Sequence, residues 1–209
     1  RAAARRGTAA QGRDVPYRGL MQSALLIAGG QSHRLGQPKQ SLEFEGESLA
    51  ARAAGVLAQV AQRVTIVGPP GDRPKWVPVE CDWVSDPYPH GGPLVGLATG
   101  LAAVRGALVA VAPCDLPLLT PATYRALRSA AKDNRAAVAT WQQPQPLVAV
   151  YWREATLATA QRLLAQGERR VQQLLDELPH ELVERHEVTL NLNTPADLER
   201  LSKTGLTGR

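Results

Sequence analysis

The sequence predicts an α/β protein: one Rossmann-like, three-layer domain built around a mostly parallel sheet. Two observations lead to this fold class. Short, continuous apolar runs alternate along the chain with longer segments of helical character, and such runs are typical of parallel strands that are covered on both faces. The length of 209 residues suits one well-buried domain and is short for two.

The apolar runs and the helical segments can be assigned in chain order. We expect strands at residues 24–28, 64–67, 107–112, 136–140, 147–152 and 182–188. We expect helices at residues 48–60, 93–104, 121–131, 154–165, 168–178 and 195–201. Pro93 suits a first helical turn, Thr120 and Thr194 are candidate N-caps, and Gly167 separates two helices. The segment between residues 68 and 92 is expected to be irregular.

The net charge of +5 comes largely from the first twenty residues. They hold five of the 24 basic residues and one of the 19 acidic ones, which leaves 19 basic and 18 acidic residues in 21–209. The sequence therefore predicts an extension at 1–20, without stable structure, and a folded domain at 21–209. The extension is interpreted as added sequence or as translated leader before Met21, in preference to an Arg-rich targeting peptide. A nucleic-acid-binding role would rest on this extension alone.

Neither cysteine usage nor hydropathy indicates a secreted or membrane protein. Cys81 and Cys114 are too few for a disulfide framework and lack metal-ligand spacing. No apolar run approaches the roughly 20 residues of a membrane span. We therefore expect a cytoplasmic protein with two reduced thiols, and neither a membrane nor a nucleic acid as partner.

The loop after the first expected strand carries the strongest signal in the chain. Adjacent Gly29 and Gly30 let the backbone approach a ligand and present its N–H groups, and Arg34 and Lys39 add two cations suited to a triphosphate. The loop has neither the Walker pattern nor the Gly-x-Gly-x-x-Gly fingerprint. Taken alone, a glycine pair beside two cations is also compatible with a structural turn.

Two aspartates follow expected strands or turns. Asp115 comes directly after the strand at 107–112, where a carboxylate at the ligand-binding edge of the sheet offers Mg²⁺ a hard oxygen ligand. Asp86 stands before a proline in a glycine-rich and proline-rich segment. The alternative for each residue is a turn or capping role.

The complete loop pattern resembles a known family. Ile27-Ala28-Gly29-Gly30-Gln31-Ser32-His33-Arg34-Leu35-Gly36-Gln37-Pro38-Lys39 is similar to the opening of the nucleotidyltransferases that activate molybdopterin, sugar phosphates and polyol phosphates. The Ala-Gly-Gly form resembles the guanylyltransferase branch of the molybdopterin enzymes, whereas the cytidylyltransferases have Ala-Ala-Gly. The family often has aspartate before the lysine, and Pro38 departs from that pattern. The resemblance extends from Ser23 to about Leu201 and adds the nucleotidyltransferase type to the predicted fold.

The resemblance implies roles for individual residues. The segment Pro113-Cys114-Asp115-Leu116-Pro117 is similar to the family's metal-binding motif, which makes Asp115 the expected Mg²⁺ ligand. Asp115, Lys39 and Arg34 are the expected catalytic residues. Nucleotide contacts are expected from Ile27, Ala28, Gly29, Gly30, Lys39, Asp86 and Asp115. The asparagine that usually follows the family's second strand is missing at Val67-Gly68-Pro69.

The carboxyl-terminal part carries two further motifs of the family. Gly167-Glu168-Arg169-Arg170 matches a recurring Gly-Glu-Arg-Arg, and its arginines could equally form a solvated helix start. Asn191 and Asn193 belong to a terminal Asn-x-Asn-Thr-Pro pattern. Their amides either contact the acceptor or tie down the chain.

The resemblance implies transfer of GMP from GTP to molybdopterin, with or without bound molybdenum, with Mg²⁺ as cofactor and pyrophosphate as the second product. The nearest alternatives are cytidylyl transfer to molybdopterin and nucleotidyl transfer to a sugar phosphate. A non-catalytic GTP-binding module that delivers the cofactor to protein partners is the alternative from another class.

Overall fold

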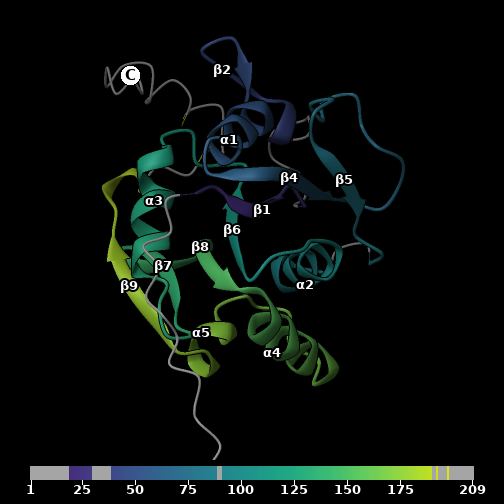
Figure 1. The fold of residues 1–209 in the computed structure, drawn as a ribbon. Coiled ribbons are helices and arrows are strands. Elements are labelled where there is room, and N and C mark those ends of the chain that lie inside the picture. The colour runs from purple at the N-terminus through teal and green to yellow at the C-terminus, as the bar shows by residue number, and fades with distance from the viewer. Residues whose placement is uncertain (1–18, 30–38, 89–90, 190–191, 193–196, 198–209) are drawn as a thin grey trace, which may run out of the picture.

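The computed structural model describes residues 19–29, 39–88, 91–189, 192 and 197, with the side chain of Lys39 excepted. A seven-stranded sheet with the order β5-β4-β1-β6-β8-β7-β9 runs through the molecule, and helices cover both of its faces (Figure 1). The predicted extension at 1–20 lies outside the described residues except for Gly19 and Leu20, so its separation from the domain stays a prediction. Within the described ranges, none of the helices has both the length and the apolar character of a membrane-crossing segment.

The elements follow in this order. The strands are β1 (Met21–Ile27), β2 (Glu43–Phe44), β3 (Glu47–Ser48), β4 (Ala61–Gly68), β5 (Asp82–Ser85), β6 (Leu108–Pro113), β7 (Ala136–Trp141), β8 (Gln143–Trp152) and β9 (His180–Glu184). The helices are α1 (Leu49–Ala58), α2 (Pro93–Ala103), α3 (Pro121–Ala130), α4 (Arg153–Ala165) and α5 (Gln173–Glu177). Two 3-10 turns, η1 (Lys39–Ser41) and η2 (His186–Val188), complete the described chain.

The sheet is mostly parallel, as the sequence predicts. β1 pairs in parallel with β4 on one side and with β6 on the other, and β4 pairs in parallel with β5. β8 is antiparallel to both β6 and β7, and β7 is parallel to β9. Every described strand of this sheet except β8 therefore ends at the same edge, which is where α/β proteins bind their ligands.

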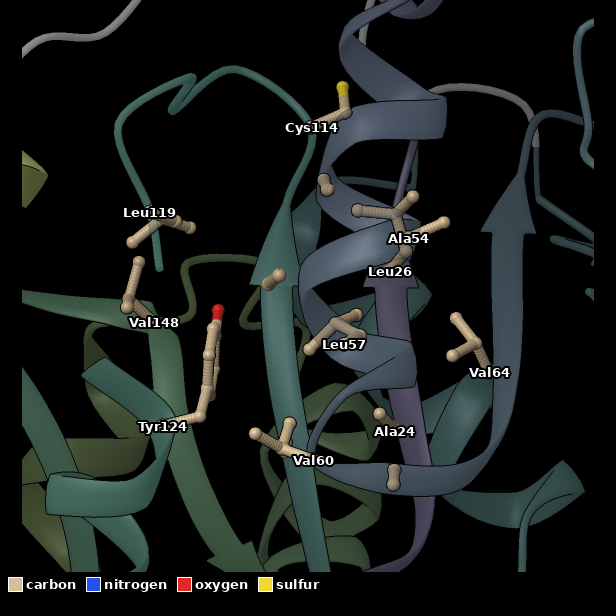
Figure 2. Packing of buried hydrophobic residues seen from close by; sticks show 14 of the residues in the cluster. Ala24, Leu26, Ala54, Leu57, Val60, Val64, Cys114, Leu119, Tyr124 and Val148 are labelled. Carbon is tan, nitrogen blue, oxygen red and sulfur yellow. The ribbon is translucent and has the colours of Figure 1, made fainter. Parts of the chain in front are cut away.

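Two apolar layers hold the helices against the sheet. On one face, α1 and α3 pack on the sheet; Figure 2 shows Ala54 and Leu57 of α1 above Ala24 and Leu26 of β1. On the other face, the buried side chains of α2, α4 and α5 pack on β1, β6, β7 and β8. Because both faces of β1 are covered, its sequence is continuously apolar from Ala24 to Ile27.

Local capping explains several helix ends that the sequence predicts. Thr120 is the N-cap of α3, where it forms a capping box with Thr123, and Ser48 caps α1 by accepting from the Ala51 N–H at 3.1 Å. Gly167 has a φ of +86° after α4. The N–H groups of Gly167 and Glu168 donate to Leu164 and Leu163 at 3.0 Å each. This is the Schellman arrangement, which a glycine in the left-handed region permits.

The structure differs from the prediction in four parts of the chain. The irregular stretch contains β5, which the apolar pattern misses because its four residues are only half-buried. The hairpin of β2 and β3 has two residues per strand, too few to show a period. The helix expected at 168–178 is reduced to α5, and the strand expected at 182–188 is β9, which ends at Glu184 and is followed by η2. The helix expected at 195–201 lies outside the described residues except for Asp197.

Helix α2 approaches the sheet closely through its glycines. A Cβ on Gly100 would lie 2.9 Å from Leu25 Cδ1 and 2.9 Å from Val67 Cγ2, and both of these side chains are buried in the core. Such distances are shorter than van der Waals contact, so an alanine at this position would push α2 away from β1 and β4.

We expect Gly100→Ala to lower the free energy of unfolding by about 1–3 kcal/mol, because overpacking outweighs the better helix propensity of alanine. Gly55→Ala is the matched control, since Gly55 lies in the middle of α1 and a Cβ there would meet nothing within 4 Å. This variant should gain up to about 1 kcal/mol. Urea unfolding of both variants measures the difference, and equal effects of the same sign would contradict the close approach of α2.

Candidate functional site

The carboxyl edge of the sheet collects most of the described residues that the sequence singles out. Ile27 ends β1 and is followed by Ala28 and Gly29, Asp86 follows β5, and Asp115 lies two residues beyond the end of β6. Gly30, Arg34, Asn191 and Asn193 lie outside the described residues. Lys39 begins η1, so its backbone has a place in the structure but its side chain does not.

The end of β1 offers open backbone. The Ala28 N–H donates to the Val67 carbonyl at 2.8 Å and so continues the pairing with β4 by one residue. Ala28 is buried, whereas the next residue, Gly29, is exposed, and a Cβ there would meet nothing within 4 Å. The chain therefore emerges from the core at Gly29 with its main-chain groups accessible to a ligand.

Asp86 is held in a turn at the edge of the sheet. Its N–H donates to the Gly68 carbonyl at 2.8 Å, and its Oδ1 accepts from the Tyr88 N–H at 3.0 Å. Its other carboxylate oxygen, Oδ2, lies 3.9 Å from the position of a Cβ on Gly96 in α2. The turn role considered for Asp86 is therefore present, and it leaves Oδ2 as the oxygen that is available to a ligand.

Gly68 ends β4, within the segment where the family resemblance predicts an asparagine and this chain has none, and Trp83 leaves no space for a side chain at this position. A Cβ on Gly68 would lie 2.1 Å from Trp83 Cη2. The Trp83 ring is packed edge-on against Trp76, with 5.9 Å between the ring centroids. At this strand end the indole thus takes the place that an amide side chain would need.

Asp115 is linked to the carboxyl-terminal motif. Its carbonyl accepts from the Leu192 N–H at 2.9 Å, and Leu192 is the residue between Asn191 and Asn193. Leu192 is itself buried in a small apolar cluster with Leu42, Phe44 and Leu49. The structure thus joins the metal-binding motif and the terminal motif through main-chain and apolar contacts.

The arrangement of the described carboxylates fits a metal ion whose coordination shell is completed by oxygens of the substrate. The described residues contain no group of three or more His, Cys, Asp or Glu side chains that could hold an ion. β5 and β6 are separated by β4 and β1, so Asp86 and Asp115 follow strand ends about 14 Å apart. Asp115 is therefore the candidate ligand, and Mg²⁺ fits one carboxylate when phosphate oxygens and waters complete its shell.

The Gly-Glu-Arg-Arg segment docks on the start of α2. The Arg169 carbonyl accepts from the Leu94 N–H at 3.4 Å, and Arg169 Nη1 donates to the Leu164 carbonyl at 3.1 Å. Glu168 accepts from the N–H groups of Arg169 and Arg170 at 2.8 Å each and pairs with the Arg170 guanidinium. These bonds favour a structural role for the two arginines, outside a helix.

Two features of the site escape the sequence analysis. Gln40, directly after Lys39, is buried and donates from Nε2 to the Ala28 carbonyl. A concavity of about 420 Å³ at the ends of β7 and β9 is lined by Thr140, Trp141, Gln142, Leu182 and Glu184. Adjacency to Lys39 is the only signal that could have pointed to Gln40. Nothing local could have indicated the concavity, because the pairing of β7 with β9 forms it.

The arrangement is typical of an α/β protein that binds its ligand at the carboxyl edge of the sheet: accessible glycine backbone follows one parallel strand, and a carboxylate follows its neighbour. The model of the MobA-like NTP transferase domain matches residues 24–183, and the chain belongs to this family. The resemblance found from the loop motifs is thereby confirmed.

Individual relatives agree with this family. A protein of Synechococcus elongatus named probable molybdenum cofactor guanylyltransferase is 36% identical over 194 residues, which cover 86% of this chain and 97% of that protein. A protein of Chloroflexus aggregans with the same name is 34% identical and covers 86% of this chain and 93% of its own. The solved structure of molybdopterin-guanine dinucleotide biosynthesis protein A from Archaeoglobus fulgidus has a TM-score of 0.70 at 20% identity, over 88% of this chain and 98% of that one. At that identity the structural likeness shows the fold alone.

The ion pair between Glu168 and Arg170 in the Gly-Glu-Arg-Arg segment stabilises the fold at neutral pH more than at acidic pH. Hydrogen bonds from the Arg170 side chain, and then from the N–H groups of Arg170 and Arg169, lower the pKa of Glu168 to about 2. Because the folded pKa lies below the unfolded one, this stabilisation is complete above about pH 4.5 and is lost as the pH falls toward 2. We expect Glu168→Gln to lower Tm at pH 7 and to have little effect near pH 2. Thermal unfolding across this range checks it, and a Tm difference that does not change with pH would contradict it.

Proposed function

We propose that this protein transfers GMP from GTP to the terminal phosphate of molybdopterin and releases pyrophosphate. The observation that carries the proposal is the pairing of β1 with β6, in which Ile27 lies opposite Pro113. It places the open Gly29 backbone and Asp115 just beyond neighbouring strand ends, about 4.8 Å apart. The names of the relatives, which cover nearly the same length of chain, support guanylyl as the transferred group.

The proposed chemistry needs charge neutralisation and alignment and uses no protein nucleophile. The acceptor phosphate attacks the α-phosphorus of GTP in line, and pyrophosphate leaves on the opposite side. Mg²⁺, when bound by Asp115, supplies positive charge to the phosphate oxygens. In this proposal Lys39 and Arg34 offset charge on the triphosphate. Ile27, Ala28, Gly29 and Gly30 contact the nucleotide, which lies along the end of β1.

The two substrates are proposed to approach from opposite sides of Asp115. Asp86 lies on the β5 side, where its Oδ2 suits a hydroxyl of the ribose or an N–H of the base. The Leu192 N–H bonds to the Asp115 carbonyl, and this proximity supports the proposal that Asn191 and Asn193 face molybdopterin. The proposed compartment is the cytoplasm, where the two buried thiols stay reduced and protein partners receive the product.

A turnover assay with molybdopterin and GTP, CTP or ATP tests the proposed function. We expect GTP to be preferred by about tenfold to a hundredfold, because an unpaired buried polar group costs the wrong base about 1–3 kcal/mol. Gly29→Ala should reduce the preference without unfolding the protein, since its Cβ would face open space. A preference for CTP would assign cytidylyl transfer, and GTP binding without pyrophosphate release would assign a non-catalytic delivery module.

Asp115→Asn should lose about a hundredfold or more in kcat, as is typical when one interaction with the charge of the transition state is removed. The fold should survive, because the main-chain contact of Asp115 with Leu192 does not involve the carboxylate. Asp133→Asn is the matched control: Asp133 lies before β7 at the opposite edge of the sheet, and asparagine tolerates its φ of +50°. Wild-type turnover of Asp115→Asn at saturating Mg²⁺ would remove Asp115 from the active site.

A further inference from the structure

Gln40 connects the two ends of the segment that follows β1. It lies in η1, is only 4% exposed, and donates from its carboxamide Nε2 to the carbonyl of Ala28, twelve residues earlier. Ala28 is the last residue whose N–H belongs to the pairing of β1 with β4. The carbonyl bound by Gln40 is therefore the first main-chain acceptor beyond the sheet.

This bond fixes the orientation of the next N–H group. The peptide unit between Ala28 and Gly29 is planar and trans, so its C=O and N–H groups point in opposite directions. With the carbonyl held by Gln40, the Gly29 N–H points away from Gln40. Gln40 belongs to a turn that contacts α1, whereas α2 and Asp86 lie on the opposite face of the sheet. Among the described residues, no acceptor for the Gly29 N–H is found.

The surroundings of the Gln40 amide oxygen indicate that glutamine contributes at this position through its N–H donor. Its Oε1 is buried without a hydrogen-bond partner in the described part of the chain. A rotated amide would place Oε1 against the Ala28 carbonyl oxygen, which is also an acceptor, and would gain nothing. An apolar side chain of the same size would avoid the cost of the unsatisfied oxygen. The contribution that distinguishes glutamine here is its bond to Ala28.

We propose that Gln40 is a positioning residue for the nucleotide: it holds the Ala28 carbonyl and thereby aims the Gly29 N–H at an acceptor on the guanine base. This role rests on the proposed function, because it assigns the base of GTP to the end of β1. The base lies away from the reacting phosphorus, so Gln40 acts on the binding of GTP and leaves the chemical step unchanged.

The test compares Gln40→Met, which keeps the size of the side chain and removes the donor, with the wild-type protein. We expect the Kd for GTP, measured by titration calorimetry, to rise about tenfold and kcat to stay within about twofold, since only a base contact is weakened. Gln40→Asn keeps the amide, but its side chain is one methylene too short to reach Ala28. This variant should raise the Kd for GTP by a similar factor.

Tyr124→Phe is the matched control. The Tyr124 hydroxyl is buried and donates to the Val111 carbonyl at 3.1 Å, so this variant also removes a buried side-chain bond to a strand carbonyl. It should lower Tm and leave the Kd for GTP unchanged. Wild-type Kd values in both Gln40 variants, or an equal loss of GTP affinity in Tyr124→Phe, would overturn the positioning role.

The binding and turnover measurements test the positioning role and the proposed function independently of each other. If the wild-type protein binds GTP but does not transfer GMP to molybdopterin, the proposed function is wrong and the Kd values still decide the role of Gln40. If it transfers GMP and the Gln40 variants bind GTP as tightly as the wild type, only the positioning role is wrong.

Discussion

The position of each described site residue depends on the parallel pairing of β1 with β4 on one side and β6 on the other. The register places Ile27 opposite both Val67 and Pro113. The strands β1, β4 and β6 therefore end side by side at the same height of the sheet. A parallel central strand must be covered on both faces, and α2 can cover one of them closely because Gly100 lacks a side chain. Gly96 of the same helix lies next to the Asp86 carboxylate, so α2 also borders the candidate site.

The loops beyond these strand ends are held by bonds from segments distant in sequence. The Asp86 N–H binds the Gly68 carbonyl, the Asp115 carbonyl accepts from Leu192, and the Ala28 carbonyl accepts from Gln40. Each of these bonds fixes main chain at the candidate site. Charge-neutralising chemistry depends on such preorganisation, because the groups must already lie where negative charge develops. The candidate site therefore consists mainly of main chain that these hydrogen bonds hold in place, and Asp115 adds a carboxylate to it.

Local sequence predicts the central strands and the residues directly after them, because β6 and the second half of β1 are continuously apolar and are followed by Asp115 and Gly29. It fails where a partner far along the chain decides. β5 is half-buried at the edge of the sheet and pairs only with β4, so its sequence shows no apolar run. The Glu168 side chain accepts hydrogen bonds from the N–H groups of Arg169 and Arg170. The helix predicted from residue 168 is therefore reduced to α5. Gln40 has a contact twelve residues away that no local pattern contains.

The packing beside Gly68 bears on how the proposed nucleotide is recognised. Trp83 occupies the space beside Gly68, so the end of β4 can present main chain but no amide side chain. Asp86 uses Oδ1 for its own turn and keeps Oδ2 alone for a ligand. Because few side-chain groups lie on the β4 and β5 side, the proposed function assigns discrimination between bases to the main chain after β1. An N–H group selects a base only if its direction is fixed, since a freely rotating peptide would accommodate an acceptor or a donor equally. In the proposed function, the absence of a side chain at Gly68 therefore makes specificity depend more strongly on the bond between Gln40 and Ala28.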